Sequence, residues 1–339
     1  MNAKGVVMAV LIPGGAGYIG SHTVCEIMEL GREAVVMDNL QTGHAEAVHP
    51  RAKFYHADIR DAASLERVFS ENSIDAVIHF AANSQVGESV DKPLRYYDNN
   101  LYGTMALLEA MERHGIGKIV FSSTAAVYGE PERVPIPESA PTIPTNPYGE
   151  TKLDVEKMLK WVANAGGLRY VSLRYFNACG AREDGGIGED HSPETHLIPI
   201  ILQVANQTRP SLSVYGDDYD TPDGTCVRDY IHVTDLAQAH ILALRHLENG
   251  GESDVFNLGN GSGFSVREVI NAAIAVTGVT IPYTMAKRRA GDPARLVASN
   301  EKARRVLGFT PRYPDLAEII RTAWRWHKSH PYGFMSGQR

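Results

Sequence analysis

A glycine-rich turn near the start of the chain constrains the fold more than any other sequence feature. The apolar run Val6–Ile12 leads through Pro13 into the turn, and a helical apolar pattern starts at Tyr18. A GxxGxxG turn between a strand and a helix lets backbone amides and the helix N-terminus approach a pyrophosphate. Tight packing of the helix on the strand is the alternative explanation. The context favours a dinucleotide site, with contacts from Gly14, Gly17, Tyr18, Ile19 and Gly20.

The first half of the chain alternates short β-rich runs with helical apolar patterns. We expect strands at 6–12, 34–37, 53–56, 75–81, 118–123 and 170–176, and helices at 18–30, 62–72, 93–114 and 148–163. Such alternation is typical of a parallel sheet whose crossover helices cover both faces. The sequence therefore predicts an α/β fold with a Rossmann-like doubly wound parallel sheet.

Beyond Asn177 the alternation gives way to glycine- and acid-rich turns, short strands and separate helices. We expect strands at 212–215 and 255–258, and helices at 197–206, 234–247, 266–276 and 316–327. This pattern indicates a smaller C-terminal α/β lobe that binds the substrate. We assign residues 1–177 to the dinucleotide-binding domain and residues 178–339 mainly to the second lobe. The two are expected to interleave, because no Pro/Ser-rich linker separates them.

Composition limits the possible partners and the compartment. A chain of 339 residues with a formal net charge of −7 is a poor nonspecific binder of nucleic acid, so its ligand is expected to be small. Cys25, Cys179 and Cys226 are widely spaced, without a CxxC or Cys/His cluster, which favours reduced thiols, a cytoplasmic location and no bound metal. The run Val6–Ile12 is too short to span a membrane.

Acidic residues follow the second and third expected strands. Asp38 stands about twenty residues after the glycine turn, where a carboxylate accepts the ribose hydroxyls of NAD and repels the 2′-phosphate of NADP. NAD is therefore the expected cofactor. Asp58 and Ile59 stand where an adenine edge would lie, although an acidic residue at a strand end is often only a turn former.

The pair Tyr148 and Lys152 makes this binding fold a candidate redox catalyst. Pro147 presets a helix start, so the two residues are i, i+4 neighbours on one helical face. An ammonium group within about 4–6 Å lowers the pKa of a phenol, which can then take a proton from a substrate hydroxyl as hydride leaves the same carbon for nicotinamide. Tyr283 and Lys287 repeat the spacing in a short extended segment, where we expect no role in the chemistry.

Further motifs join the glycine turn and the Tyr148/Lys152 pair. They are Phe121-Ser122-Ser123-Thr124-Ala125-Ala126-Val127-Tyr128-Gly129 and Leu173-Arg174-Tyr175-Phe176-Asn177. Together they resemble the extended short-chain dehydrogenase/reductase family. Within that family the chain is similar, nearly from end to end, to the UDP-glucose 4-epimerase branch. The most specific stretches are 14–22, 79–81, 86–90, 96–100 and 227–233.

The resemblance implies an NAD-dependent epimerase that interconverts UDP-galactose and UDP-glucose through a 4-keto sugar. Tyr148 would be the acid/base, helped by Lys152 and by Thr124, which would hydrogen-bond the 4-hydroxyl. NAD would be regenerated in each turnover. A homodimer that pairs through helices 93–114 and 148–163 is also implied.

The resemblance also implies which residues hold the two ligands. Arg228 and Arg289 would clamp the pyrophosphate, a task suited to planar, permanently charged guanidinium groups. Asp292 would bind the uridine ribose, and Asn177 a phosphate oxygen or the sugar. The uracil and the sugar would be bordered by His196, Leu197, Tyr215 and Leu296. Further cofactor contacts would be Asn39, Phe80, Ala81, Asn99 and Tyr175, beside Tyr148 and Lys152.

Four positions depart from the pattern of some relatives. Pro13 replaces a Thr before the double glycine, which removes an N–H from that turn. Ser84 replaces a Lys near the cofactor, and fewer charge contacts would loosen NAD. His196 replaces an Asn, so its role stays open. Leu296 replaces the Tyr of relatives restricted to UDP-glucose and UDP-galactose, which predicts activity on UDP-N-acetylglucosamine unless this Leu is ordinary core packing.

The residues after Thr124 separate the possible reactions. Nucleotide-sugar 4,6-dehydratases carry an acid and a base there, such as Asp-Glu, whereas this chain has Ala125-Ala126, and alanine cannot move a proton. Two other functions stay open. One is a 4-epimerase of a UDP-pentose or of UDP-glucuronate. The other is a non-catalytic NAD-sensing regulator, although such proteins typically lose the Tyr or the Lys.

Overall fold

The computed structural model describes residues 8–289 and 292–334. Its larger part is a seven-stranded parallel sheet with the strand order β11-β6-β5-β4-β1-β2-β3, which confirms the predicted doubly wound sheet. The strands are β1 (Ala9–Pro13), β2 (Glu33–Asp38), β3 (Lys53–His56), β4 (Ile74–His79), β5 (Lys118–Ser122), β6 (Arg169–Tyr175) and β11 (Asp254–Leu258). Residues 6 and 7 of the first predicted strand lie outside the described residues.

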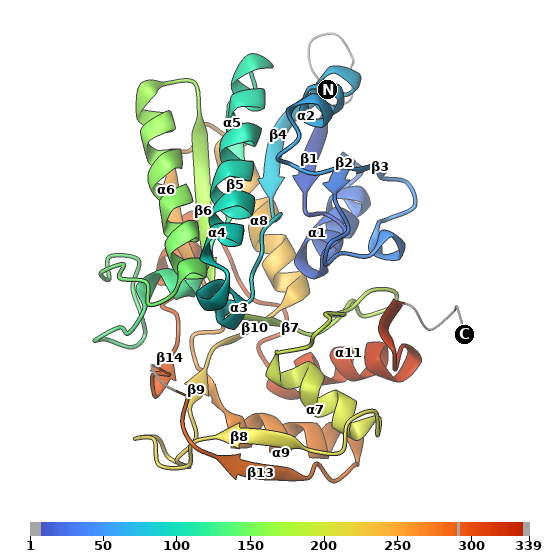
Figure 1. Ribbon diagram of the computed structural model, residues 1–339, viewed down its shortest axis with the longest axis vertical. Helices are drawn as coiled ribbons and strands as arrows, with labels where there is room; N and C mark the ends of the chain where they lie inside the picture. The colour runs from blue at the N-terminus through green and yellow to red at the C-terminus, as the bar shows by residue number, and fades with distance from the viewer. Residues whose placement is uncertain (1–7, 290–291, 335–339) are drawn as a thin grey trace.

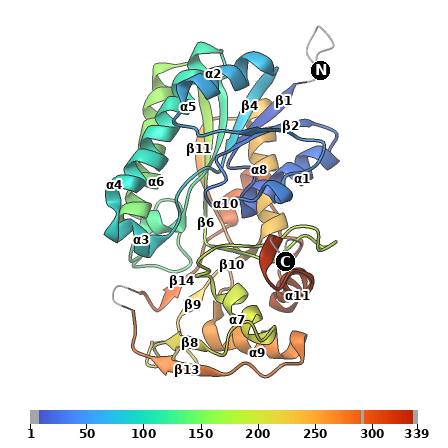
Figure 2. The same ribbon diagram turned by 45° about the vertical axis from the view of Figure 1, so that its right-hand side comes forward.

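Helices cover both faces of this sheet, as Figure 2 shows. Successive residues of a strand point to opposite faces, so Val10 and Ile12 of β1 enter one buried cluster while Ala9 and Leu11 enter the other. The first cluster packs on α1 (Tyr18–Glu29), α8 (Val233–Glu248) and α10 (Glu301–Leu307). The second packs on α2 (Ala62–Glu71), α5 (Gly103–Arg113) and α6 (Pro147–Ala165).

The single helix predicted at 93–114 is wrong in its middle. The segment is divided into α4 (Pro93–Tyr96), a π-helical turn η2 (Tyr97–Tyr102) and α5, and the short helix α3 (Val86–Asp91) precedes it. Over one turn, the spacing of apolar residues does not distinguish i→i+5 from i→i+4 hydrogen bonding. Such π turns are frequent at functional sites.

The smaller lobe packs three helices against a two-stranded parallel sheet, at the lower end of the molecule in Figure 1. Its elements are α7 (Leu197–Ala205), α9 (Val266–Thr277), α11 (Leu316–Ser329), β8 (Leu212–Tyr215) and β13 (Tyr283–Ala286). Tyr283 is in strand β13, so it shares no helical face with Lys287, as the sequence predicts.

Two small sheets connect the lobe to the larger part. One pairs β7 (Asn177–Cys179) with β10 (Tyr230–His232). The other has the order β12-β9-β14 and consists of β12 (Phe264–Ser265), β9 (Val227–Arg228) and β14 (Arg295–Leu296).

The chain crosses between the two parts more often than a boundary at Asn177 implies. Strand β11 pairs with β6, and helices α8 and α10 pack on the large sheet. These three segments, which the sequence assigns to the smaller lobe, therefore belong to the larger part. Phe256 and Leu258 of β11 are fully buried there. A short apolar strand has the same pattern at the edge of either sheet, and only its pairing decides where it lies.

The arrangement places the site at one edge of the large sheet. In a doubly wound sheet, ligands bind beyond the carboxyl ends of the strands. In Figure 1 this edge faces the smaller lobe. Within residues 8–289 and 292–334, none of the helices is both long enough and apolar enough to cross a membrane.

Candidate active site

A cavity of about 750 Å³ lies between the carboxyl edge of the large sheet and the smaller lobe. Most of the residues predicted from the sequence line it. They are Gly14, Gly17, Tyr18, Ile19, Gly20, Asp38, Asn39, Ile59, Phe80, Ala81, Asn99, Thr124, Tyr148, Lys152, Tyr175, Asn177, His196, Arg228, Arg289, Asp292 and Leu296. The cavity therefore brings the predicted cofactor and substrate contacts together.

Three predicted contacts lie outside the lining. Asp58 accepts hydrogen bonds from Asn39 Nδ2 (2.8 Å) and Arg60 Nη2 (2.7 Å), and the bonds from Arg60 hold its pKa well below the usual range. Leu197 packs against the core of the smaller lobe. Tyr215 supports Arg289, whose guanidinium carbon lies 4.1 Å from the ring centroid.

The glycine turn is close-packed against the end of β4. Gly14 has φ +82°, and a Cβ there would lie 2.4 Å from the backbone nitrogen of Ala81. A Cβ at Gly20 would lie 2.1 Å from the carbonyl oxygen of Gly14. The carbonyl of Pro13 accepts from the amides of Phe80 (2.8 Å) and Ala81 (2.9 Å), so this turn is anchored through an acceptor that proline retains. The glycines thus allow close packing, and Gly14, Gly17 and Gly20 also line the cavity.

Asp38 is held at the end of β2 by two backbone amides. Its carboxylate accepts from Ala16 N (3.0 Å) and Leu40 N (2.8 Å). Burial raises its pKa, and the two amide bonds oppose that rise. The carboxylate therefore lies beside the glycine turn and on the cavity wall, as a ribose acceptor must.

Tyr148 lies at the first turn of α6, where the sequence fixes the helix start. Asn146 is the N-cap, its side chain accepts from Gly149 N (2.9 Å), and Pro147 follows at the first helical position. Tyr148 and Thr124 form a side-chain hydrogen bond. The hydroxyl of Thr124 also accepts from Ala126 N (3.1 Å), which fixes it at the end of β5.

The prediction that Lys152 lowers the pKa of Tyr148 is wrong for the protein without cofactor or substrate. Burial raises the pKa of Tyr148, and only the Thr124 hydrogen bond opposes that rise. Lys152 is itself buried, which lowers its pKa to about 7. Its ammonium donates to the carbonyl of Ser122 (2.7 Å) and lies 4.8 Å from the ring centroid of Phe121. Helical spacing places both side chains on the cavity wall, but burial decides their charge.

A buried ion pair under α6 was not predicted. Arg174 donates from Nε (2.9 Å) and Nη2 (2.5 Å) to the carboxylate of Glu156, one turn beyond Lys152. Ser123 Oγ donates to the same carboxylate (2.5 Å). The pair and the serine together join α6 to β6 and to the end of β5. Glu156 is four residues from Lys152, and that spacing is the only sequence signal that could have drawn attention to it.

The opposite wall of the cavity carries the predicted substrate contacts. Arg228 on β9 forms an ion pair with Asp292, and both side chains are largely buried. Asn177 Nδ2 donates to the carbonyl of Asp229 (2.9 Å). Leu296 pairs in register with Arg228 and packs against the cluster around Tyr128, while it also lines the cavity. Leu296 therefore both packs against the core and lines the cavity.

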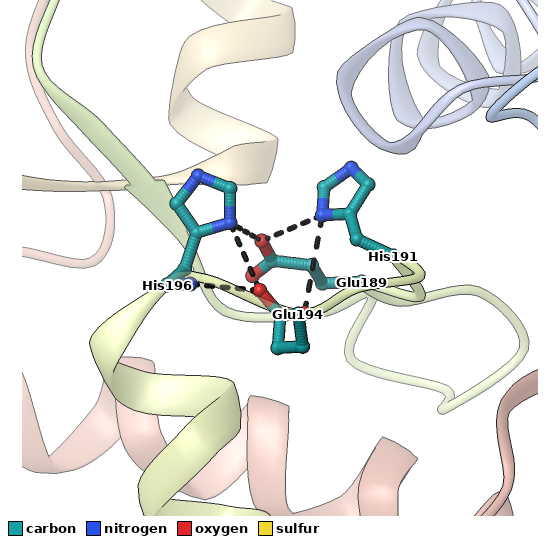
Figure 3. Close-up of side chains that lie close together, drawn as sticks. All are labelled: Glu189, His191, Glu194 and His196. Atoms are coloured by element: carbon teal, nitrogen blue, oxygen red, sulfur yellow. Dashed lines mark hydrogen bonds and ion pairs between the residues drawn. The ribbon is translucent and has the colours of Figure 1, made fainter. Parts of the chain in front are cut away.

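Four side chains of the segment 189–196 converge in the same wall, and Figure 3 shows them. They are Glu189, His191, Glu194 and His196. Only His196 is among the predicted contacts. The spacing Glu-x-His-x-x-Glu-x-His was the signal that could have revealed the group.

Comparisons with known proteins agree with this geometry. The sequence model of the NAD dependent epimerase/dehydratase family matches residues 10–259. The chain belongs to this family. It is 60% identical over 327 residues to the UDP-glucose 4-epimerase of Halalkalibacterium halodurans, with 96% of this chain and 98% of the relative covered.

Solved structures give the same result. The crystal structure of UDP-glucose 4-epimerase from Brucella ovis in complex with NAD matches with a TM-score of 0.91 and 51% identity, covering 94% of this chain and 97% of that chain. The structure of UDP-glucose 4-epimerase from Bifidobacterium longum in complex with NAD⁺ and UDP matches with a TM-score of 0.91 and 44% identity, covering 96% and 100%.

Membership of the epimerase/dehydratase family makes NAD the cofactor, and the residues present fit it. The first turn of α1 has no side-chain cap and no acidic residue, so its amides are available to an anionic pyrophosphate. Asp38 can accept the ribose hydroxyls at the end of β2. Bound NAD supplies a hydride acceptor, and Tyr148 and Lys152 lie on the wall of the same cavity.

Proposed function

We propose that the protein interconverts UDP-galactose and UDP-glucose through a 4-keto sugar, as a 4-epimerase that keeps NAD bound. One observation carries the proposal. A single cavity holds Tyr148 and Thr124 between the NAD turn on one side and Arg228 with Asp292 on the other. A nucleotide sugar that spans this cavity presents its hydroxyl to Tyr148 while its diphosphate meets the arginines.

The residues after Thr124 favour epimerisation over dehydration. Ala125 and Ala126 line the cavity at the place where a dehydratase needs an acid and a base. Without them the 4-keto sugar can only be reduced again, and reduction on its other face gives the epimer. The carboxylate of UDP-glucuronate would require a further cation near the sugar, so a UDP-sugar with a neutral hexose is the better substrate.

The two walls of the cavity have different roles in the proposed reaction. Tyr148 takes the proton of the 4-hydroxyl and later returns it, with Thr124 holding that oxygen in place. Arg228 and Arg289 clamp the diphosphate and Asp292 the uridine ribose, so binding energy is concentrated on the nucleotide. The sugar is then held loosely enough to rotate. The smaller lobe supplies most of these nucleotide contacts.

A coupled assay tests the proposal. Purified protein is incubated with UDP-galactose alone, and UDP-glucose is measured with a UDP-glucose dehydrogenase added after quenching. We expect UDP-glucose to form with no net production of NADH before the dehydrogenase is added. A 4-keto-6-deoxy sugar in the mass spectrum, or no product with Tyr148 intact, would contradict the assignment.

The lining also supports a wider substrate range. Leu296 is shorter than Tyr and has no hydroxyl, and it borders the cavity beside Arg228. An acetamido group at carbon 2 of the sugar can occupy the space that a Tyr would fill. The protein therefore also acts on UDP-N-acetylglucosamine in this proposal.

The assembly that we propose is a homodimer through the face formed by α3 to α6. Large apolar side chains are exposed there, with Leu94 81% and Trp161 74% exposed, and Val90, Tyr102 and Met105 accompany them. Such a patch is typical of a protein interface. Sedimentation of the parent and of Trp161→Glu tests it, and a monomeric parent would contradict it.

Cys25, Cys179 and Cys226 are buried and free, which supports a reducing compartment such as the cytoplasm.

A further inference from the structure

The segment between β7 and α7 gathers four possible metal ligands in the cavity wall (Figure 3). One ligand atom from each of Glu189, His191, Glu194 and His196 lies within 4.8 Å of the others. His196 Nδ1 lies 2.7 Å from Glu189 Oε1 and 3.1 Å from Glu194 Oε1. His191 Nδ1 lies 3.2 Å from Glu189 Oε1 and 3.9 Å from Glu194 Oε2. Ligands about 2.0 Å from a tetrahedral ion are about 3.3 Å apart, and these separations bracket that value.

The charges in the cluster need compensation. The side chains of Glu189 and Glu194 are 4% and 5% exposed, and two carboxylates this close and this buried require two positive charges. Among the described residues, the ion-pair partners of these two carboxylates are His191 and His196 alone. Two protonated imidazoles or one divalent cation would meet the requirement.

The surroundings of one nitrogen in the cluster favour a divalent cation over two protonated imidazoles. Nδ1 of His191 is buried and makes no hydrogen bond, although Glu189 Oε1 lies 3.2 Å away. The distance between these two atoms therefore suits an ion pair, but the angle at Nδ1 does not suit the donation of a proton to the carboxylate. A metal ion between the two atoms would use both lone pairs without that angular demand.

Neighbouring groups hold the ligands in place. Glu194 Oε1 accepts from the amides of Thr195 (2.7 Å) and His196 (2.8 Å). The carbonyl of Glu189 accepts from Trp326 Nε1 (3.2 Å). The ring of His191 stands edge-on to that of Tyr18, with centroids 6.2 Å apart. Outer contacts of this kind orient the ligands of metal sites.

We propose that Glu189, His191, Glu194 and His196 bind one divalent transition-metal ion of the zinc class. Two imidazoles and two carboxylates suit such an ion, and two carboxylates neutralise its charge. The ion would join the segment 189–196 into one rigid wall and fix His196 beside the substrate. Glu189, His191 and His196 line the cavity, so the ion has a path of entry.

Binding of the ion competes with protons. Neutral imidazoles are the ligands, so the ion must displace these protons, and its affinity increases with pH.

The parent protein, with its NAD retained, gives the first test. After treatment with a chelator and dialysis, it is titrated with Co²⁺, and the visible d–d bands are followed. Zn²⁺ is then added to displace the cobalt. We expect one ion per chain, a tetrahedral cobalt spectrum, and affinity that increases with pH. Absence of a stoichiometric site for either ion would overturn the proposal and leave the cluster as ion pairs only.

Substitutions then locate the ion. His196→Gln and Glu194→Gln should each weaken Zn²⁺ binding by at least ~10-fold and remove the increase in Tm that Zn²⁺ produces. His246→Gln is the matched control, because His246 lies at the far end of α8, where it bonds the carbonyl of Glu252. Should His196→Gln fail to fold, Glu194→Gln preserves side-chain shape and decides. Parent-like binding in the folded ligand variants would place the ion elsewhere and refute the assignment.

Discussion

The buried ion pair beneath α6 gives a direct test of what holds the site residues in place. The side chains of Arg174 and Glu156 are 7% and 6% exposed. In Glu156→Gln the guanidinium stays buried without its counter-charge, and loss of one partner of a buried pair costs about 3–5 kcal/mol of unfolding free energy. The amide retains one acceptor oxygen for Arg174 or Ser123. We therefore expect the lower end of the range, about 3 kcal/mol.

A matched substitution on the same helix controls for the chemistry of the change. Glu150 pairs with Lys157 at 3.6 Å, but these side chains are 39% and 55% exposed, so Glu150→Gln should cost at most ~1 kcal/mol. Urea unfolding at fixed NAD concentration measures both variants, and unchanged m-values would permit the comparison. The double variant Glu156→Leu/Arg174→Met removes both charges and should recover much of the loss. Equal, small losses for the two Gln variants would refute the reasoning.

The same substitution should move the pH profile. The charge of Glu156 supports the ammonium of Lys152, whose pKa burial lowers to about 7. Without that charge the pKa of Lys152 falls further. Activity that needs the ammonium is lost as pH rises through this pKa, so the descending limb of kcat against pH should move to lower pH in Glu156→Gln. A limb that stays in place would show that Glu156 acts on stability alone.

Three further predictions address the chemistry, the cofactor turn and the substrate range. Tyr148→Phe should lose roughly 10²–10⁴ in turnover while it still binds NAD and UDP, whereas Tyr283→Phe should turn over like the parent in the same coupled assay. Gly20→Ala places a Cβ 2.1 Å from a backbone oxygen and should lose NAD in fluorescence titration, whereas Gly87→Ala meets nothing within 4 Å and should bind normally. Leu296→Tyr should cost roughly ten- to two-hundred-fold in kcat/KM on UDP-N-acetylglucosamine alone. Equal losses on UDP-galactose would instead make Leu296 a packing residue.

The fold could be predicted where a local pattern decides the structure. The glycine turn and the alternation of strands and helices specify a doubly wound sheet, because each crossover needs one strand and one helix in sequence. The pattern fails where partners are distant or where backbone bonding changes within one turn. Strand β11 is placed by pairing with β6, some eighty residues earlier, and η2 by an i→i+5 bond that leaves the apolar spacing unchanged.

The same distinction applies to the residues of the site. Contacts carried by motifs, such as Tyr148 and Asp38, were predicted because their spacing to neighbouring elements is fixed. The pair of Glu156 with Arg174 was not, because it joins α6 to β6 across the fold. Glu189 and Glu194 were not predicted either, because an irregular loop without a periodic pattern of apolar residues brings them together.

Burial explains why spacing alone overstates the reactivity of Tyr148 and Lys152. It disfavours the charged form of each, which raises the pKa of the phenol and lowers that of the ammonium. A phenolate here needs positive charge beyond that of Lys152. An oxidised nicotinamide ring carries one such charge, and a reduced ring does not. Tyr148 would therefore be held as the phenolate, ready to accept a proton, beside the oxidised ring, and as the phenol, ready to donate one, beside the reduced ring. A 4-epimerase needs this order, because it removes the proton first and returns it afterwards.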